Sequence, residues 1–275
     1  MADISAKDVM ALRNRTGLPM MACKKALAET GGDIDAAEDH LRKTLKGKME
    51  GRTERAAAEG RVAVAVNGTA AAIVDLRAET DFTAKNDKFI EAADKIAQLA
   101  LAAPAGEVTP TDEMNAIMDD IRISTGENAS IGRVHKIEKD NGESFSSYVH
   151  HDGKTAVLIH ATAGAADDVL RQICMHITAV VPRPLGITAD DIPAELVEKE
   201  RKFRMEQAVE SGKNEEIAAM MVEGGIKKFY SEVALNEQDF VVDPSKKIKD
   251  LLGGAAIKEF FRWEVGEGVE ADSGE

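Results

Sequence analysis

The stretch that decides the fold is Arg61–Arg77, which reads RVAVAVNGTAAAIVDLR. Two runs of small and β-branched residues, Val62–Val66 and Ala72–Val74, lie on either side of Asn67-Gly68. An Asn-Gly pair between two such runs favours a tight turn, so this stretch predicts a β-hairpin. The next segment, Asp87–Ala103, repeats apolar residues at helical spacing and predicts an amphipathic helix. A hairpin followed by a helix indicates an α+β core.

A similar order of elements occurs again further along the chain. Three stretches have the composition of strands and predict a meander: Val134–Glu138, Phe145–His150 and Thr155–Thr162. The segment Asp167–Val181 then aligns its apolar residues on one helical face. We therefore expect two related core halves, each a hairpin or meander with a helix. They would occupy residues 61–140, and residues 141–192 together with 232–268.

The N-terminal residues 1–45 predict a module of three short helices. Ser5 can cap the first helix, with Asp8 completing a capping box. Pro19 suits the first position of the second helix, and Gly31-Gly32 ends it. In outline the module resembles ubiquitin-associated (UBA) domains, which bind other proteins. So small a core is marginal alone, which suits a docking role.

Three more segments lie outside the core halves. Residues 46–60 carry glycines among Lys, Arg and Glu and predict a charged, partly helical linker. Residues 193–231 predict an inserted polar helical hairpin that turns at Gly212-Lys213-Asn214. Residues 269–275 form an acidic tail.

Composition narrows the class of protein. Against 35 Lys+Arg stand 49 Asp+Glu, a net charge of −14 over 275 residues, so direct nucleic-acid binding is not expected. Two cysteines cannot build a disulfide framework. The first residues show no secretory signal, and no apolar stretch is long enough for a membrane span. We expect a soluble, cytoplasmic protein without membrane contact.

The common catalytic signatures are missing. The sequence contains no phosphate-binding loop, no dinucleotide fingerprint and no nucleophile elbow. His150 and His151 are neighbours on a predicted strand end and would point to opposite faces, so a shared metal ion is not expected. We expect no catalytic residue, no metal site and no enzyme activity.

Two segments carry a family resemblance. The first is Leu12–Gly17, LRNRTG, followed by Met20–Leu27, MMACKKAL; the second is Glu79–Asn86, ETDFTAKN. Together, and with FFRWEVGEG at Phe260–Gly268, they resemble the elongation factor Ts family over essentially the full length. Members of that family are guanine-nucleotide exchange factors for bacterial elongation factor Tu. The chain departs from the family pattern at Thr83, where Val is usual.

The resemblance implies a mechanism and a set of contacts. The protein would bind elongation factor Tu with its GDP, disturb the Mg²⁺ and phosphate site, and promote GDP release so that GTP can bind. The residues implied at the Mg²⁺-displacement region are Thr80, Asp81, Phe82 and Thr83. The residues implied in docking are Arg13, Met20, Met21 and His150. No cofactor is implied, and a homodimer or a heterotetramer with the partner is compatible with the family.

The residues support such roles independently. Met20 and Met21 lie ~100° apart on one helix, so one of them should lie at the margin of the small core or outside it. Phe82 precedes a helix whose apolar face begins at Phe89, so its side chain is free to project.

Alternatives to each of these interpretations remain open from the sequence. Both methionines could edge the core, Phe82 could fold back onto it, and Thr80 with Asp81 could merely cap a turn. The alternative function is a UBA-like protein-binding adaptor or nascent-chain binder without exchange activity.

Overall fold

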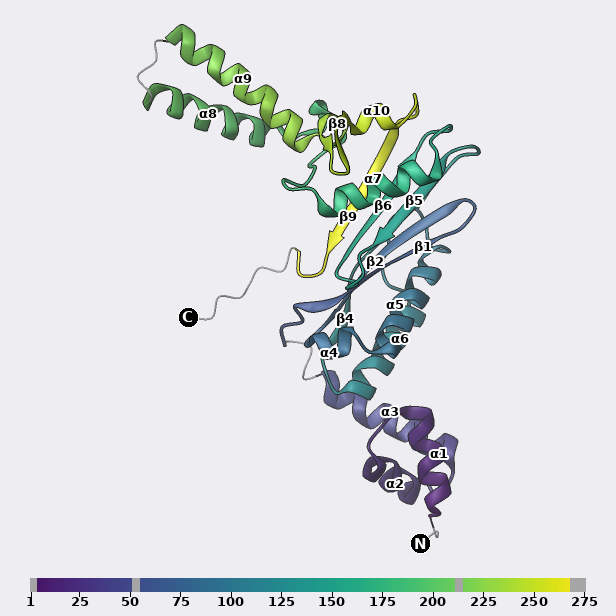
Figure 1. Cartoon of the computed structure of the whole chain (residues 1–275). Coiled ribbons are helices and arrows are strands. Elements are labelled where there is room, and N and C mark those ends of the chain that lie inside the picture. Colours follow the sequence, from purple (N-terminus) through teal and green to yellow (C-terminus); the bar gives the residue numbers. More distant parts are fainter. Residues whose placement is uncertain (1–3, 51–54, 211–214, 268–275) are drawn as a thin grey trace. The chain divides into compact units, whose positions relative to one another are not determined.

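The computed structural model describes residues 4–50, 55–210 and 215–267. The chain divides into two compact units, Met1–Ile137 with Glu264–Glu275, and Glu138–Trp263. The predicted α+β class is confirmed: three N-terminal helices precede antiparallel sheets with helices, and a helical hairpin is inserted before the last strands (Figure 1). Among the described residues, no helix has the length and apolarity needed to cross a membrane.

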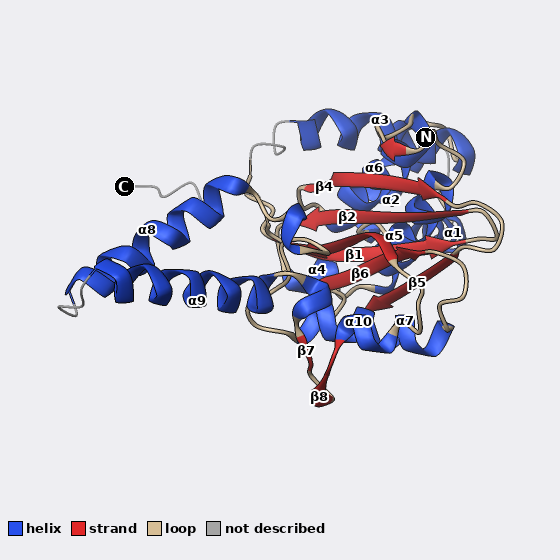
Figure 2. Cartoon of the chain, turned by 90° about the horizontal axis from the view of Figure 1, so that it is seen from above, coloured by secondary structure: helices blue, strands red, loops and turns tan. Residues whose placement is uncertain are grey.

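The first unit contains a four-stranded sheet. Its strands run in the order β1-β2-β4-β3. Their bounds are Glu59–Val66 for β1, Ala70–Ala78 for β2, Gly106–Glu107 for β3 and Ala129–Glu138 for β4. Figure 2 shows β1, β2 and β4 side by side.

The predicted hairpin is β1–β2, paired antiparallel from Glu59↔Ala78 to Val66↔Ala71. Its turn is closed by Asn67, whose backbone N–H donates to the carbonyl of Ala70 at 2.8 Å. The Asn67 side-chain oxygen also accepts from the backbone N–H of Ala70 at 2.7 Å. The side chain of Asn67 therefore makes the turn, which is centred one residue later than Asn67-Gly68.

Helices α5 (Asp87–Ala100) and α6 (Asp112–Thr125) form the core of the first unit with this sheet. The core combines the even-numbered residues of β2 with one face of each helix, as the amphipathic pattern predicted for α5. Its large members include Leu76, Phe89, Ile96, Met114 and Met118.

The opposite face of β2 carries a buried ion cluster. Arg77 binds the carboxylate of Asp75 through Nε and Nη2, with 2.7 Å between Nη2 and Oδ2. Arg133 lies 3.4 Å from the same carboxylate and 3.3 Å from that of Glu267, whose backbone carbonyl accepts from Arg77 at 3.1 Å. Burial raises the pKa of Asp75, because its loss of water outweighs the attraction of the two guanidinium groups. The cluster ties the end of the described chain to the first sheet.

The N-terminal module consists of α1 (Ala6–Thr16), α2 (Met20–Glu29) and α3 (Ile34–Glu50). Its helices enclose a core of their own, with Leu12, Cys23 and Leu27 fully buried. Ser5 caps α1 as predicted, accepting from the N–H of Asp8 at 3.1 Å. Helix α3 continues to Glu50, inside the segment expected as a linker; residues 51–54 of that segment lie outside the described residues.

The second unit has a three-stranded sheet in the order β5-β6-β9. Its strands are β5 (Ser144–Val149), β6 (Thr155–Ala161) and β9 (Ile257–Glu264), and its core includes α7 (Asp167–Ala179). The predicted meander is therefore wrong in its first strand, because β4 belongs to the other sheet. Val134 of β4 packs in the first core, and β9 takes the place beside β6. A strand pattern fixes the face of a strand but not its neighbour.

Buried His160 links all three strands of this sheet. Its Nε2 lies 2.7 Å from Glu143, just before β5, and its Nδ1 lies 3.0 Å from Glu259 of β9. Lys258 donates to the same Glu143 at 2.8 Å. The hydrogen bond from Lys258, with those from Asp140 and His160, lowers the pKa of Glu143 to about 2. These contacts help to hold β9 in the sheet.

The predicted helical hairpin consists of α8 (Ala194–Glu210) and α9 (Glu215–Val233). Val197 and Val222 are buried between them, and Arg201 forms an ion pair with Glu223 across the two helices. The expected turn at Gly212-Lys213-Asn214 lies outside the described residues, as does the expected acidic tail.

Short elements complete the second unit. They are two 3₁₀ turns, a two-stranded ribbon and a short helix: Ala189–Asp191, Leu235–Glu237, β7 (Asp239–Phe240), β8 (Asp243–Lys247) and α10 (Ile248–Leu251).

Candidate partner-binding site

The residues Thr80–Thr83 form a single helical turn between β2 and α5. This turn, α4 (Asp81–Ala84), begins at Thr80, whose hydroxyl accepts from the backbone N–H of Thr83 at 3.3 Å. Phe82 is 83% exposed, whereas Thr83 is only 5% exposed. The expectation that Phe82 projects is confirmed, and the alternative that it folds back onto the core is wrong. Thr80 also caps the turn, as the alternative interpretation of Thr80 and Asp81 had it, while Asp81 lies inside the turn. The cap and the projecting Phe82 belong to the same element.

A pair of carboxylates holds the start of α4. Glu127 accepts from the Thr80 hydroxyl at 2.8 Å and from the Thr80 backbone N–H at 3.2 Å. In the opposite direction, Glu79 accepts from the backbone N–H of Asn128 at 2.7 Å. These four residues, here called the Thr80–Glu127 clasp, join the end of β2 to the start of β4.

The end of α4 is held by the start of α5. Asn86 caps α5 through its side chain, which accepts from the N–H of Lys88 at 2.9 Å, and its own N–H donates to the carbonyl of Thr83 at 3.1 Å. Asp81 forms an ion pair with Lys85 at 2.7 Å on the exposed side. Phe82 is thus an exposed aromatic side chain on a turn fixed at both ends, which is the arrangement of a binding residue.

The module presents the predicted docking residues to solvent. Met20 is 48% and Met21 74% exposed, while Cys23 and Leu27 on the same helix are fully buried. The expectation that one methionine lies at the margin or outside the core is confirmed, and both are accessible. Arg13 is also exposed, in the last turn of α1.

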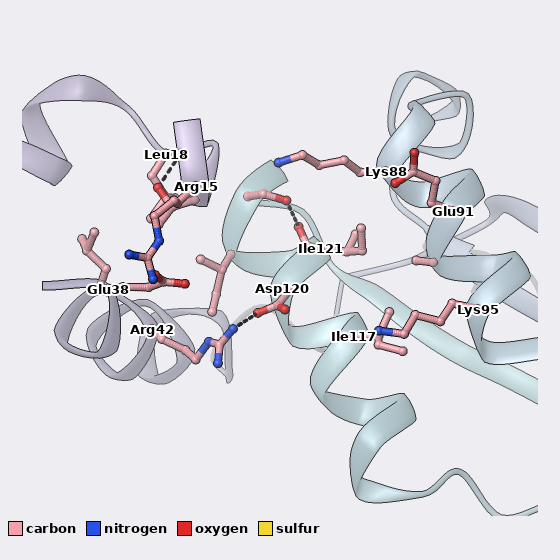
Figure 3. Close-up of a pocket in the computed structure, with 15 residues that line it drawn as sticks. Arg15, Leu18, Glu38, Arg42, Lys88, Glu91, Lys95, Ile117, Asp120 and Ile121 are labelled. Atoms are coloured by element: carbon pink, nitrogen blue, oxygen red, sulfur yellow. Dashed lines mark hydrogen bonds and ion pairs between the residues drawn. The ribbon is translucent and has the colours of Figure 1, made fainter. Parts of the chain in front are cut away.

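The module contacts the core helices of its own unit beside a pocket (Figure 3). Arg42 of α3 forms an ion pair with Asp120 of α6 at 2.9 Å. Ile123 of α6 packs against the module core. Lys88 and Lys95 of α5 line the other side of the pocket. Sequence reasoning missed this contact, because a single ion pair between distant residues leaves no pattern.

His150 lies in the second unit, in the turn between β5 and β6. Its Nδ1 lies 3.0 Å from the Asp152 carboxylate, and its side chain is about a third exposed. Partial burial would raise the pKa of Asp152, but the hydrogen bond from the N–H of Lys154, together with the contact with His150, lowers it. The turn offers a partly accessible imidazole held in one orientation.

The described residues bring together no group of three His, Cys, Asp or Glu side chains that could hold a metal ion. Both cysteines are buried and free, and burial raises the pKa of the Cys174 thiol to about 12. A thiol with that pKa is not a nucleophile near neutral pH. The arrangement suits binding through exposed apolar and charged side chains.

Comparison with known proteins gives consistent matches. A family model described as elongation factor TS matches residues 79–267. A protein named elongation factor Ts from Vibrio cholerae serotype O1 is 40% identical over 278 residues, which cover 98% of this chain and 95% of the relative. Its namesake from Erwinia tasmaniensis is 41% identical over 276 residues, 98% and 94% of the two chains. That from a Psychrobacter species is 38% identical over 280 residues, again 98% and 94%.

Proposed function

Since the chain belongs to the elongation factor Ts family, we propose that its exposed α4 turn drives nucleotide exchange. The protein is a guanine-nucleotide exchange factor for elongation factor Tu in translation elongation, and it is not an enzyme. The observation that carries the proposal is Phe82, an aromatic side chain 83% exposed on a turn fixed at both ends.

The proposed mechanism is differential binding. A bound nucleotide is held by Mg²⁺ across its phosphates and by backbone amides around them. Phe82 and Asp81 would insert beside that site and stabilise a displaced arrangement of the partner. Coupling between two ligands is reciprocal. Binding of the exchange factor therefore lowers the affinity of the partner for GDP, and bound GDP lowers the affinity of the partner for the exchange factor.

The free energy gained by burying one Phe side chain limits how much Phe82 alone can accelerate GDP release. Full burial of a Phe side chain contributes about 1.5–3 kcal/mol. Each tenfold acceleration needs about 1.4 kcal/mol of differential stabilisation. Phe82 therefore accounts for roughly one to two powers of ten in GDP release at saturation, and Asp81 adds to it, while the docking contacts supply affinity for the partner.

The other predicted residues take supporting roles in this proposal. Arg13, Met20 and Met21 dock the module onto the partner, and His150 contacts another part of it. Thr83 is buried, so we assign it to holding the turn instead of touching the partner. A Thr at this position adds a hydroxyl to a buried site where Val would present only methyl groups.

The finer organisation belongs to the same proposal. The N-terminal helices act as a UBA-like docking module, the segment up to residue 60 as a connection, and the hairpin 193–231 as a coiled-coil insertion peripheral to exchange. The protein would act in the cytoplasm, where translation takes place. A homodimer or a heterotetramer with elongation factor Tu would be distinguished from a one-to-one complex by light scattering of the purified complex.

The test is the release of a fluorescent GDP from elongation factor Tu, followed by stopped flow with saturating Phe82→Ala. We expect release about 10- to 100-fold slower than with the parent protein and an unchanged melting temperature. Val66→Ala, at another exposed apolar residue of the same unit, is the matched control and should exchange like the parent. A Phe82→Ala protein that exchanges at the parental rate would show that the α4 turn does not drive exchange. A parent protein that leaves the rate of GDP release unchanged would favour the adaptor function instead.

A further inference from the structure

We infer that Glu127 is a positioning residue for exchange: acting through Thr80, it fixes the direction in which Phe82 leaves the protein. This inference rests on the proposed function of Phe82. It assigns the role to a carboxylate that does not belong to the motif Thr80–Thr83 and lies in the connection between α6 and β4.

The contact geometry supports a specific hold on Thr80. The Glu127 oxygens lie 2.8 and 3.1 Å from the Thr80 hydroxyl, and one lies 3.2 Å from the Thr80 nitrogen. The same hydroxyl accepts from the N–H of Thr83 at 3.3 Å. Because the hydroxyl hydrogen is directed to Glu127, a lone pair is left to cap α4. Glu127 thus orients the cap as well as the backbone at the first residue of the turn.

A glycine at the end of α6 places Glu127 beside Thr80. Helix α6 ends at Thr125 and is capped by Gly126 with φ 73°, a left-handed conformation that turns the chain toward β4. Since β2 and β4 are hydrogen-bonded neighbours, residues before β4 lie beside residues after β2. Asn128 reinforces the contact, donating its N–H to Glu79 and its side-chain amide to the carbonyl of Arg55, both at 2.7 Å.

A turn of this size depends on such a hold. Helix α4 has 4 residues, far fewer than an isolated helix needs to be stable. On its exposed side the Asp81–Lys85 ion pair supports it, and exposed pairs of this kind contribute little. A binding side chain that is free to reorient loses affinity for the state it must stabilise. Release of the clasp should therefore reduce exchange while Phe82 itself is still present.

The first experiment measures the motion of residue 82 in the isolated protein. Phe82→Cys is labelled with a nitroxide; the native cysteines Cys23 and Cys174 are buried, so the label goes to position 82. Electron paramagnetic resonance should show a more mobile label when Glu127→Ala is added. Glu127→Gln should restore most of the order, since its amide oxygen still accepts from Thr80. Glu113→Ala, which removes an exposed carboxylate from α6, is the control and should leave the spectrum unchanged.

The second experiment is a double-mutant cycle on stimulated GDP release at saturating exchange factor. Glu127→Ala and Thr80→Val should each slow release about 5- to 20-fold, with Glu127→Gln close to the parent. In a Phe82→Ala background, Glu127→Ala should cause no further loss, because the group it positions is gone.

The outcomes distinguish the positioning role of Glu127 from the proposed function of Phe82. An unchanged label mobility in Glu127→Ala, or a full additional loss in the Phe82→Ala background, would overturn the positioning role. If Phe82→Ala alone exchanges normally, the proposed function fails, while the label experiment still decides whether Glu127 orders the turn. A low melting temperature for Glu127→Ala with full exchange at a temperature where it is folded would also refute positioning.

Discussion

Helices α4 and α5 follow each other in the chain, yet their phenylalanines have opposite fates. Phe82 of α4 is 83% exposed, and Phe89 of α5 is fully buried. Helix α5 has 14 residues and buries one face in the core, whereas α4 has 4 residues, buries Thr83 and Ala84, and is held by hydrogen bonds at its ends. Stability and partner binding are therefore assigned to adjacent but separate elements, and substitutions should affect one without the other.

The largest expected effect is on stability, at Phe89. Phe89→Ala removes a buried ring between β1, β2 and the helices and should lower the free energy of unfolding by about 3–5 kcal/mol. Urea unfolding followed by circular dichroism measures the loss. At a temperature where the variant is folded, it should still stimulate GDP release, because Phe82 is unaffected. A folded Phe89→Ala protein without exchange activity would show that the two helices are not separable.

The docking residues should have the next largest effect, and on affinity rather than rate. Met21→Ala and Arg13→Ala should each weaken binding to nucleotide-free elongation factor Tu by more than about 1 kcal/mol, as interface truncations at a few residues do. Calorimetry measures this affinity, and the release rate at saturation should change little. Met10→Ala, another half-exposed methionine of the module, is the control. Parental affinity in both docking variants would contradict the docking role.

A smaller effect is expected at Asp81, beside Phe82. Asp81→Ala should slow GDP release less than Phe82→Ala does, because a charge near phosphates acts partly through space and salt screens it. The difference between Asp81→Ala and the parent should shrink as ionic strength rises. Lys85→Ala removes the ion-pair partner of Asp81, which lies 2.7 Å away, but leaves the charge of Asp81 in place. It therefore distinguishes the effect of the ion pair from the effect of the charge. A defect that is independent of salt would mean that Asp81 acts by direct contact.

The smallest effect is expected from the hairpin. Replacing residues 193–231 by a short linker should leave the core folded and the rate of GDP release close to the parent. Circular dichroism and stopped flow on the same preparation check both statements. If the core is folded but release occurs at the unstimulated rate, then exchange is not confined to the α4 region.

Local patterns in the sequence predicted much of the fold. Helical spacing located α5 and α7, and the runs around Asn67 located the β1–β2 hairpin. Such patterns are set by neighbouring residues, so one sequence contains them. The partner of a strand depends on distant residues, and the sequence therefore placed β4 in the wrong sheet.

The candidate site also has one feature that is set by neighbouring residues and one that depends on distant residues. The exposure of Phe82 followed from its position ahead of the apolar face of α5, a local property. The contact between Thr80 and Glu127 depends on β2 and β4 being neighbours, and the error in the meander concealed it. The only local signal was Gly126, a helix stop directly before Glu127.

The ion cluster of Asp75, Arg77, Arg133 and Glu267 joins parts of the chain that are made at different times. The bond from Arg77 to Glu267 spans 190 residues. At about 5–20 residues per second, the ribosome needs roughly 10–40 s to add that length. During this interval the first sheet has emerged, but Arg133 lacks the Glu267 carboxylate. The N-terminal unit is therefore begun early in translation and completed only when residue 267 leaves the ribosomal tunnel.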